Sequence, residues 1–149
     1  MPAQKFRNPI TAAAGMAVDE LFKANGASDL SGCQYRFVAL GTVAGEIVGA
    51  TGASNPFPIG ILQNGPAASG VALVRLFGRS QLKFPASPCS MVTGEFITST
   101  GCGGGTSMAA CGGVALGRYL SADAGSGVAA TCTVFVNCLL PSASLGFER

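Results

Sequence analysis

Side chains that act as general acids, bases or nucleophiles are few in this sequence and lie scattered along it. The 149 residues include no histidine, so a Ser-His or Cys-His nucleophile pair cannot form within the chain. Seven carboxylates are present, and from residue 35 onward no two of them are near each other in the sequence. Nothing in this pattern points to a carboxylate dyad for acid–base catalysis. We therefore expect a protein that is not an enzyme.

Six cysteines are the other reactive side chains, and their spacing does not favour a metal site. No two of them form a C-x-x-C pair, and without histidine zinc has almost no ligand set. We expect most of them to be reduced and to pack as small apolar side chains. Cys102 and Cys111 flank a glycine-rich segment and are the first candidates for a disulfide, if one exists. No cofactor or metal is expected.

The glycine-rich segment, residues 101–113 (GCGGGTSMAACGG), superficially resembles a phosphate-binding loop. Such a loop opens a helix and usually places a lysine and a hydroxyl group on the phosphates. This segment contains no lysine, and the residues that follow it are typical of a strand. We interpret it as a flexible surface or contact loop, and we expect no small-molecule substrate.

A row of basic side chains is the most informative candidate for binding. Residues 70–84 alternate as a strand does, with Val74, Leu76, Leu82 and Phe84 on the face expected to be inward. The other face carries Arg75, Phe77, Arg79, Gln81 and Lys83. Its three cations span about 26 Å at about 3.3 Å per residue. This face is either solvated or contacts an acidic surface of a partner or neighbouring subunit, with Phe77 exposed to help. The candidate assembly contacts are therefore Arg75, Phe77, Arg79 and Lys83.

The elements that must position this row are short strands separated by Gly, Pro and Asn. Asn64-Gly65 predicts a turn, and Gly78 predicts a bulge or bend within the long strand. This pattern indicates an all-β fold, a small antiparallel barrel or sandwich. About seven strands are predicted, at residues 35–43, 46–51, 57–63, 70–84, 94–100, 114–120 and 130–140. In the last of these, Cys132 and Cys138 are expected to face inward.

An internal repeat supports the fold class. Sliding the sequence by 57 residues brings Gly60 onto Gly117 and residues 69–72 onto the identical residues 126–129. A strand precedes and follows the matched segment in both copies, as a barrel with two-fold pseudo-symmetry requires.

The first 34 residues differ from the rest and are interpreted as an N-terminal arm. Asn8 and Pro9 suit the start of a helix, and apolar residues then recur at helical spacing, so a short helix is predicted at residues 9–24. It either plugs one end of the core or reaches a neighbouring subunit. Residues 35–140 are expected to contain every strand and to fold without the arm, and residues 141–149 form a tail. Asp19 and Glu20 close the weak apolar run, so no signal peptide is predicted.

Charged residues make up only 11 % of the chain, against roughly 25 % in an average soluble domain. The long charge-free stretches are interrupted by Pro, Gly and Asn, so none predicts a membrane span. A net charge of +2 is too small to indicate nucleic-acid binding. We attribute the missing charge to burial against other protein subunits and expect a homo-oligomer, most simply a trimer.

Several runs in the sequence resemble the capsid cement (decoration) proteins of tailed bacteriophages. They are FVALGTVAGEIVGATG at 37–52, PIGILQN at 58–64, GVALVRLFGRSQLKF at 70–84, GEFITS at 94–99 and ALGRYLSADAGSG at 115–127. The resemblance implies a compact β-barrel or β-tulip without catalytic residues, commonly a trimer on the capsid exterior.

The resemblance also implies a function. Such a protein is assembled in the host cytoplasm, binds across gaps between major capsid proteins and strengthens the head against the pressure of packed DNA. Two alternatives remain open. One is a virion-surface module that binds a receptor or glycan, although the chain has no Trp and only two Tyr. The other is a secreted, disulfide-bonded β domain, which the predicted lack of a signal peptide opposes.

Overall fold

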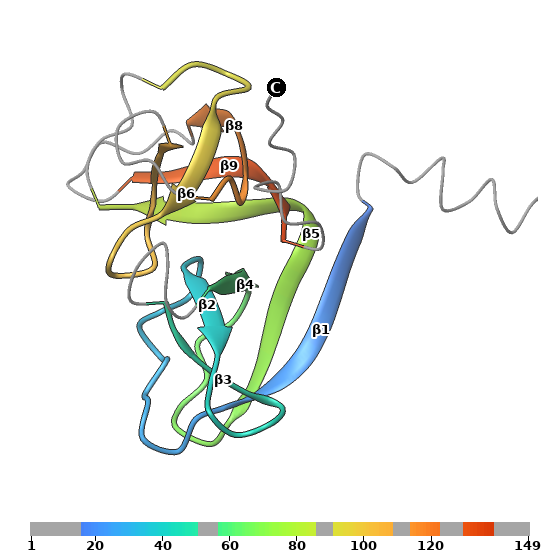
Figure 1. Ribbon diagram of the computed structural model, residues 1–149, viewed down its shortest axis with the longest axis vertical. Helices are drawn as coiled ribbons and strands as arrows, with labels where there is room; N and C mark the ends of the chain where they lie inside the picture. The colour runs from blue at the N-terminus through green and yellow to red at the C-terminus, as the bar shows by residue number, and fades with distance from the viewer. Residues whose placement is uncertain (1–15, 51–56, 86–90, 109–113, 123–129, 139–149) are drawn as a thin grey trace, which may run out of the picture.

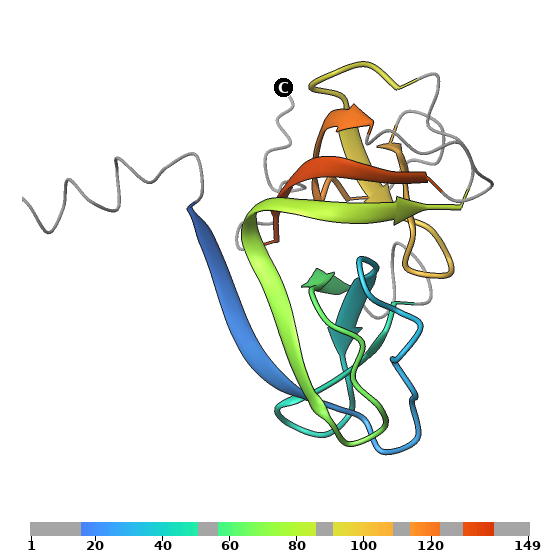
Figure 2. The same ribbon diagram turned by 180° about the vertical axis from the view of Figure 1, so that it is seen from behind.

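The computed structural model describes residues 16–50, 57–85, 91–108, 114–122 and 130–138 and shows an all-β protein (Figures 1 and 2). The described residues contain no helical element and form one nine-stranded mixed sheet. The strands are β1 Ala17–Ala24, β2 Phe37–Leu40, β3 Glu46–Gly49, β4 Pro58–Leu62, β5 Val71–Phe84, β6 Phe96–Ser99, β7 Gly105–Ser107, β8 Gly117–Ala122 and β9 Ala130–Asn137. The all-β prediction is confirmed, and all seven predicted strands are present with ends trimmed by a few residues.

The helix predicted at residues 9–24 is wrong for its described part, because residues 17–24 form the strand β1. The remainder of that helix lies outside the described residues. β1 pairs antiparallel with β5 from Ala17↔Gly78 to Lys23↔Val71, and parallel with β3 at Lys23↔Glu46. Pairing on both sides supplies backbone hydrogen bonds that outweigh the helical propensity of this segment. Residues 35–140 therefore do not contain every strand, and the sheet is mixed rather than purely antiparallel.

The long strand β5 bends at Gly78, as the sequence predicted. Gly78 has a φ of 111°, which side-chain-bearing residues rarely adopt. A Cβ atom there would also lie 2.5 Å from the Met16 carbonyl oxygen. Beyond the bend, β5 leaves β1 and pairs with β9 along the rest of its length. Figure 1 shows the two halves of β5 running in clearly different directions.

The bend divides the sheet into two units whose antiparallel strand pairings follow the same order, although only the first unit has the parallel pairing of β1 with β3. The first unit consists of β1 to β4 and β5 up to Gly78, and the second consists of the remainder of β5 and β6 to β9. In each, a hairpin (β2–β3 or β6–β7) is followed by a third strand that pairs with its first strand and by a fourth that pairs with the third. The second half of β5 lies along β9 as β1 lies along the first half of β5.

The pairing registers of the two units agree residue by residue. Val38 faces Gly60 in the first unit, and Ile97 faces Gly117 in the second, so the Gly60–Gly117 match found in the sequence is structural. A Cβ atom on either glycine would lie 2.3–2.4 Å from a carbonyl oxygen of the neighbouring strand, β5 or β9. Both positions therefore exclude larger residues for the same reason. The second half of the sequence match, residues 126–129, lies outside the described residues.

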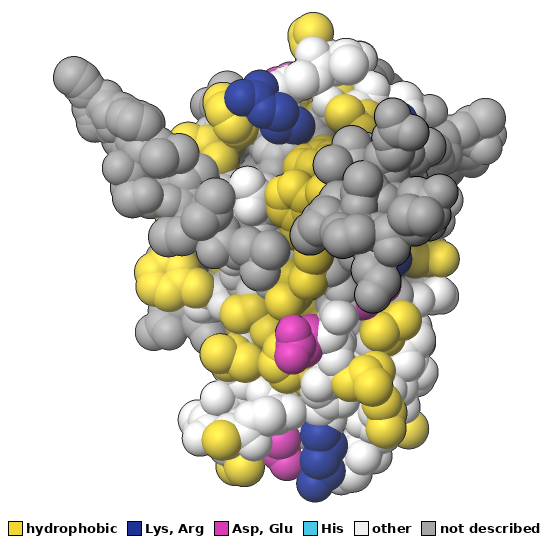
Figure 3. Space-filling model, turned by 90° about the vertical axis from the view of Figure 1, so that its right-hand side faces the viewer, with side chains coloured by type: hydrophobic (Ala, Val, Ile, Leu, Met, Phe, Trp, Pro, Cys, Tyr) yellow, Lys and Arg dark blue, Asp and Glu magenta, His cyan; other side chains and the backbone are white. Residues whose placement is uncertain are grey.

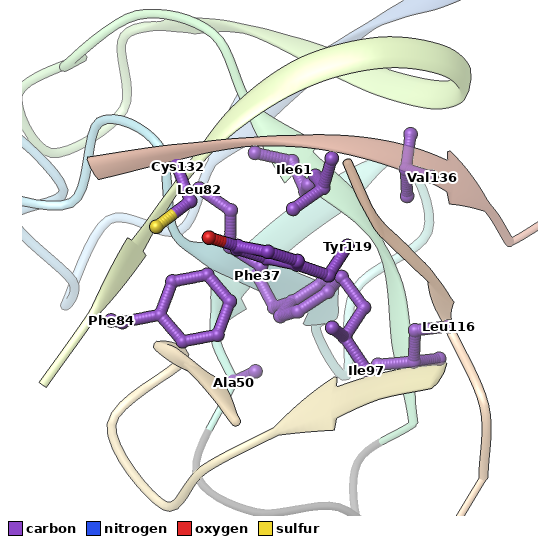
Figure 4. Close-up of a cluster of buried hydrophobic side chains, with 11 residues drawn as sticks. Phe37, Ala50, Ile61, Leu82, Phe84, Ile97, Leu116, Tyr119, Cys132 and Val136 are labelled. Carbon is purple, nitrogen blue, oxygen red and sulfur yellow. The ribbon is translucent and has the colours of Figure 1, made fainter. Parts of the chain in front are cut away.

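Each unit encloses its own apolar cluster. The first is built from Ala24, Leu30, Val38, Ile47, Leu62, Ala72 and Val74. The second contains the equivalent side chains of the second unit, among them Phe84, Ile97, Tyr119, Cys132 and Val134. Figure 4 shows that Phe37 and Ile61, which belong to strands of the first unit, enter this second cluster and lie close to Tyr119. The two units are thus packed together through the outer face of β2 and β4.

The glycine-rich segment is ordered where the structure describes it, contrary to the prediction of a flexible surface loop. β7 pairs with β6 from Ile97↔Ser107 to Ser99↔Gly105. Three consecutive glycines before and at the start of β7, Gly103, Gly104 and Gly105, are buried. A Cβ atom on Gly105 would lie 2.5 Å from Leu82 Cδ2, so glycine is required by close packing. Residues 109–113 of the segment lie outside the described residues.

Candidate assembly surface

The four predicted contact residues lie on one face of β5, but the bend divides them between the two units. Of the residues predicted to face inward, Val74, Leu82 and Phe84 are buried, and Leu76 is partly buried against the first cluster. Arg75 belongs to the first unit, whereas Arg79 and Lys83 belong to the second. Because β5 bends at Gly78, the three cations do not form the straight row of about 26 Å expected from the strand spacing.

Arg75 is already engaged within the chain. Its Nε and Nη2 atoms bond the two carboxylate oxygens of Asp19 on β1, at 2.7 and 2.8 Å. Its Nη1 atom donates to the carbonyl oxygen of Arg79 at 2.6 Å, across the bend. The hydrogen bond to Asp19 raises the pKa of Arg75. Arg75 therefore ties β1 to β5 and offers little to a partner.

Phe77 and Arg79 differ from Arg75 in what they contact. Phe77 is half-buried rather than exposed, and its ring meets the ring of Phe135 edge-on with centroids 4.9 Å apart. Arg79 is exposed and lies directly opposite Phe135 on β9. Lys83 is partly exposed at the far end of β5, opposite Thr131. Phe77 thus supports an aromatic neighbour, while Arg79 remains accessible.

The register extends this surface across three further strands. Phe135 faces Arg79 on one side and Arg118 on the other, and Arg118 faces Phe96. Arginine and phenylalanine therefore alternate across β5, β9, β8 and β6 on the outer face of the second unit. The Arg118 guanidinium lies over the Phe96 ring, 4.0 Å from its centroid, and Nη1 donates to the Gly94 carbonyl oxygen at 2.9 Å. We call these four residues, with Phe77, the arginine–phenylalanine face.

A hollow of about 150 Å³ opens beside this row. It is lined by Phe96, Ala115, Gly117, Arg118, Phe135 and Asn137. Gly117 contributes only backbone atoms to the lining, and the two phenylalanines make the walls largely apolar. The hollow has room for one ring-sized or branched apolar group.

The sequence alone did not indicate Phe96, Arg118 and Phe135 as candidate contacts. Each lies on a strand other than β5, so strand alternation in one segment did not connect them with Arg79. The Gly60–Gly117 match was the available signal, because it aligns β8 with β4 and hence Arg118 with Ile61.

The carboxylates of the described residues are mostly engaged in structural bonds. Glu46 pairs with Lys23 and accepts from Asn25, and Asp29 accepts from the Ser31 backbone N–H. Glu95 accepts from the Ser107 hydroxyl and the Val92 N–H, and these bonds lower its pKa. No group of three possible metal ligands occurs among the described residues. Nor do those residues include a helix that is long and apolar enough to span a membrane.

Four of the six cysteines are described, and none of these four forms a disulfide. Cys132 is fully buried on the inner face of β9, as predicted. Cys138 packs against the same cluster, and burial raises its pKa to about 12, so it is not a reactive thiolate. Cys102 is a free, exposed thiol, and Cys111, its predicted partner, lies outside the described residues.

The first unit presents a different outer face, which is apolar rather than basic. Leu21 on β1 and Val71 on β5 are 68 % and 64 % exposed. Leu21 lies opposite Leu73, and Val71 lies two residues further along β5, opposite Lys23. The Leu21–Leu73 pair stands between the Asp19–Arg75 and Lys23–Glu46 ion pairs. Figure 3 shows the side of the molecule on which β1 lies, where hydrophobic side chains form a band broken by few charges. We call Leu21, Leu73 and Val71 the apolar face.

Comparisons of the sequence with known proteins give no relative. No protein-family model matches the chain, and no curated protein matches it.

Proposed function

We propose that the protein is a structural component of a tailed-phage virion that binds the outside of the capsid and cements neighbouring major capsid proteins. The observation that carries this proposal is the arginine–phenylalanine face, an accessible basic and aromatic surface on a rigid sheet. Aromatic and arginine side chains are the residues that contribute most to protein–protein interfaces. The pairing of β1 with both β3 and β5 also supports the finer part of the fold proposal, a small barrel.

The apolar face supports the second part of the proposal, self-association into a trimer. Exposed leucine and valine side chains on a sheet face are typical of protein contacts when they form a patch. The low charge of the chain supports the same conclusion, because 16 charged residues cover the surface of a monomer sparsely. Each copy would then bind itself through the first unit and the capsid through the second.

Deletion of the gene from its phage tests the cementing role directly. Heads that lack the protein are expected to release their DNA at a lower temperature than wild-type heads, because the contacts between capsid subunits are fewer. Adding purified protein should restore the release temperature, and electron cryo-microscopy should show it between major capsid proteins. Heads of unchanged stability that bind none of the added protein would exclude the proposed function.

A further inference from the structure

The two units use the same outer face in different ways. In the first unit this face carries Phe37 on β2 and Ile61 on β4, both fully buried against the second unit. The registers place Phe96 and Arg118 at the equivalent positions of the second unit. There Phe96 is 44 % exposed and the hollow beside it is open. One copy of the face is therefore an interface within the chain, and the other is uncovered among the described residues.

A second copy of the chain cannot cover Phe96 in the way that the second unit covers Phe37. Tyr35, at a φ of 62°, directs its carbonyl oxygen to the Lys83 N–H at the edge of β5. In the first unit the equivalent N–H, that of Lys23, bonds to the Gly45 carbonyl oxygen, and β1 pairs directly with β3. In the second unit, the segment around Tyr35 and Phe37 therefore lies beside β5 in the place that the start of β3 takes beside β1 in the first unit. The first unit has no such place left for a second copy.

The charge of the face specifies a different occupant. Arg118 stands where Ile61 is buried, and covering its guanidinium without a carboxylate would leave a buried charge uncompensated. Within the described parts of the chain, neither Arg79 nor Arg118 has a carboxylate at ion-pair distance. Among the acids that the structure describes, Glu95 is the nearest to Arg118 in the sequence, and it already accepts from Ser107 and Val92. None of the described carboxylates pairs with these arginines, so a partner that covers this part of the sheet would supply a carboxylate of its own.

We infer that the arginine–phenylalanine face binds an acidic segment of a partner protein, with a carboxylate on Arg118 and an adjacent apolar side chain in the hollow between Phe96 and Phe135. Under the proposed function this partner is the major capsid protein, and on that point the inference rests on the proposal. Arg79 on the other side of Phe135 is placed to bind a second carboxylate. Planar, bidentate pairing with carboxylates is the geometry that arginine favours.

Binding of purified protein to phage heads that lack it tests this inference. We expect Arg118→Gln and Phe96→Ala each to weaken binding about tenfold, because each removes a central contact. Lys23→Gln is the matched control: it removes one positive charge from the outer face of the first unit and should change the affinity less than twofold. Wild-type affinity should fall with rising salt, and more steeply than the affinity of Arg118→Gln.

Photo-cross-linking identifies the occupant in the same preparation. With a benzophenone amino acid in place of Phe96, the expected product joins this position to a capsid-protein peptide that contains Asp or Glu. A product with a second copy of this chain, or with a peptide that lacks acids, would overturn the inference. So would equal binding by wild type and Arg118→Gln. If wild type itself does not bind the heads, the proposed function fails first.

Discussion

The first and second units share their antiparallel strand pairings but solve the same packing problem with different residues. Ala24 and Ile47 lie opposite each other inside the first unit. The second unit has Phe84 and Gly105 at the equivalent places, and the Phe84 ring occupies space that a side chain on Gly105 would need. The large residue and the small one have exchanged strands, and the summed volume of the two side chains stays similar. Cores tolerate such exchanges when total volume is kept.

The outer faces of the units differ in a second way. Asp19 and Arg75 form an ion pair in the first unit, and the residues at the same register in the second are Arg79 and Phe135. The first unit thus pairs Asp19 with Arg75, whereas in the second unit Arg79 and Arg118 lie beside aromatic rings and form no ion pair with the described residues. Two units with the same scaffold can therefore differ in role: the residues of one outer face stabilise the fold, and those of the other are available for binding.

Among the changes that test how far the two units are equivalent, removal of β1 should have the largest effect on the stability of the fold. Removing residues 1–24 deletes β1, exposes Val74 and Ala72, and leaves the first unit with four strands. We expect the chain to lose its cooperative melt, because water cannot replace the pairing of β1 with β3 and β5 or the packing of Ala24 in the first cluster. Removing residues 1–15 keeps all nine strands and should shift the melting temperature by only a few degrees. A cooperative melt of the shorter chain would show that β1 is dispensable and the units are not equivalent.

A double-mutant cycle tests the exchange of large and small residues in the second unit. Phe84→Ala should destabilise the protein by about 3 kcal/mol or more through the cavity it leaves. Gly105→Val should cost about 1–3 kcal/mol by overpacking against the Phe84 ring. Together the changes recreate the arrangement of Ala24 and Ile47, so the double variant should recover at least about 1 kcal/mol relative to additivity. Urea denaturation measures all three, and strict additivity would contradict the exchange.

Removing the ion pair of the first unit should have a smaller effect than either change above. Asp19→Asn should lower the free energy of unfolding by about 0.2–1 kcal/mol, because both side chains are about one-quarter exposed. Arg79→Gln in the second unit should change it by less than about 0.5 kcal/mol, since Arg79 is exposed and forms no ion pair with any residue that the structure describes. Thermal melts at low and high salt distinguish the two variants. A larger loss from Arg79→Gln would mean that Arg79 supports the fold rather than a contact.

The smallest expected effect is a pH dependence at the hairpin of the second unit. Bonds from Ser107 and Val92 lower the pKa of Glu95 below its ordinary value of 4.5. A lowered pKa in the folded state means that this contribution to stability is complete above pH about 4.5 and is lost as the pH falls. Glu95→Gln should therefore melt slightly earlier than wild type at pH 7 and alongside it at pH about 3. An equal difference at both pH values would show that the charge of Glu95 is not involved.

The sequence predicted the elements with strong local signals and missed those that depend on tertiary contacts. The long alternation in β5 and the inward cysteine of β9 came directly from the pattern of apolar residues. β1 was predicted as a helix because Ala17, Val18 and Leu21 recur at helical spacing, whereas its partners lie more than 20 residues away. β7 was hidden in a run of glycines that matter only because Phe37, Leu82 and Phe84 pack against them.

Part of the candidate surface could be predicted in the same way. Arg79 and the alternation around it follow from one strand, but Arg75 is engaged by Asp19, 56 residues away in sequence. Phe96, Phe135 and Arg118 can be recognised as parts of the same surface only when β5, β9, β8 and β6 are placed side by side. Equivalence between Phe22-Lys23 in β1 and Leu82-Lys83 in β5 would have identified β1 as a strand, because both pairs occupy the same register.

β5 passes from one unit into the other without a linker, and this continuity decides how the molecule comes apart. Two units joined by a loop could open one at a time, and amide hydrogens in each would exchange with solvent independently. Here the 14 residues of β5 supply a strand to both units, so opening either one releases the edge of the other. Amides on the two sides of Gly78 are therefore expected to exchange through one shared opening of the whole chain. The duplicated architecture behaves as a single foldon.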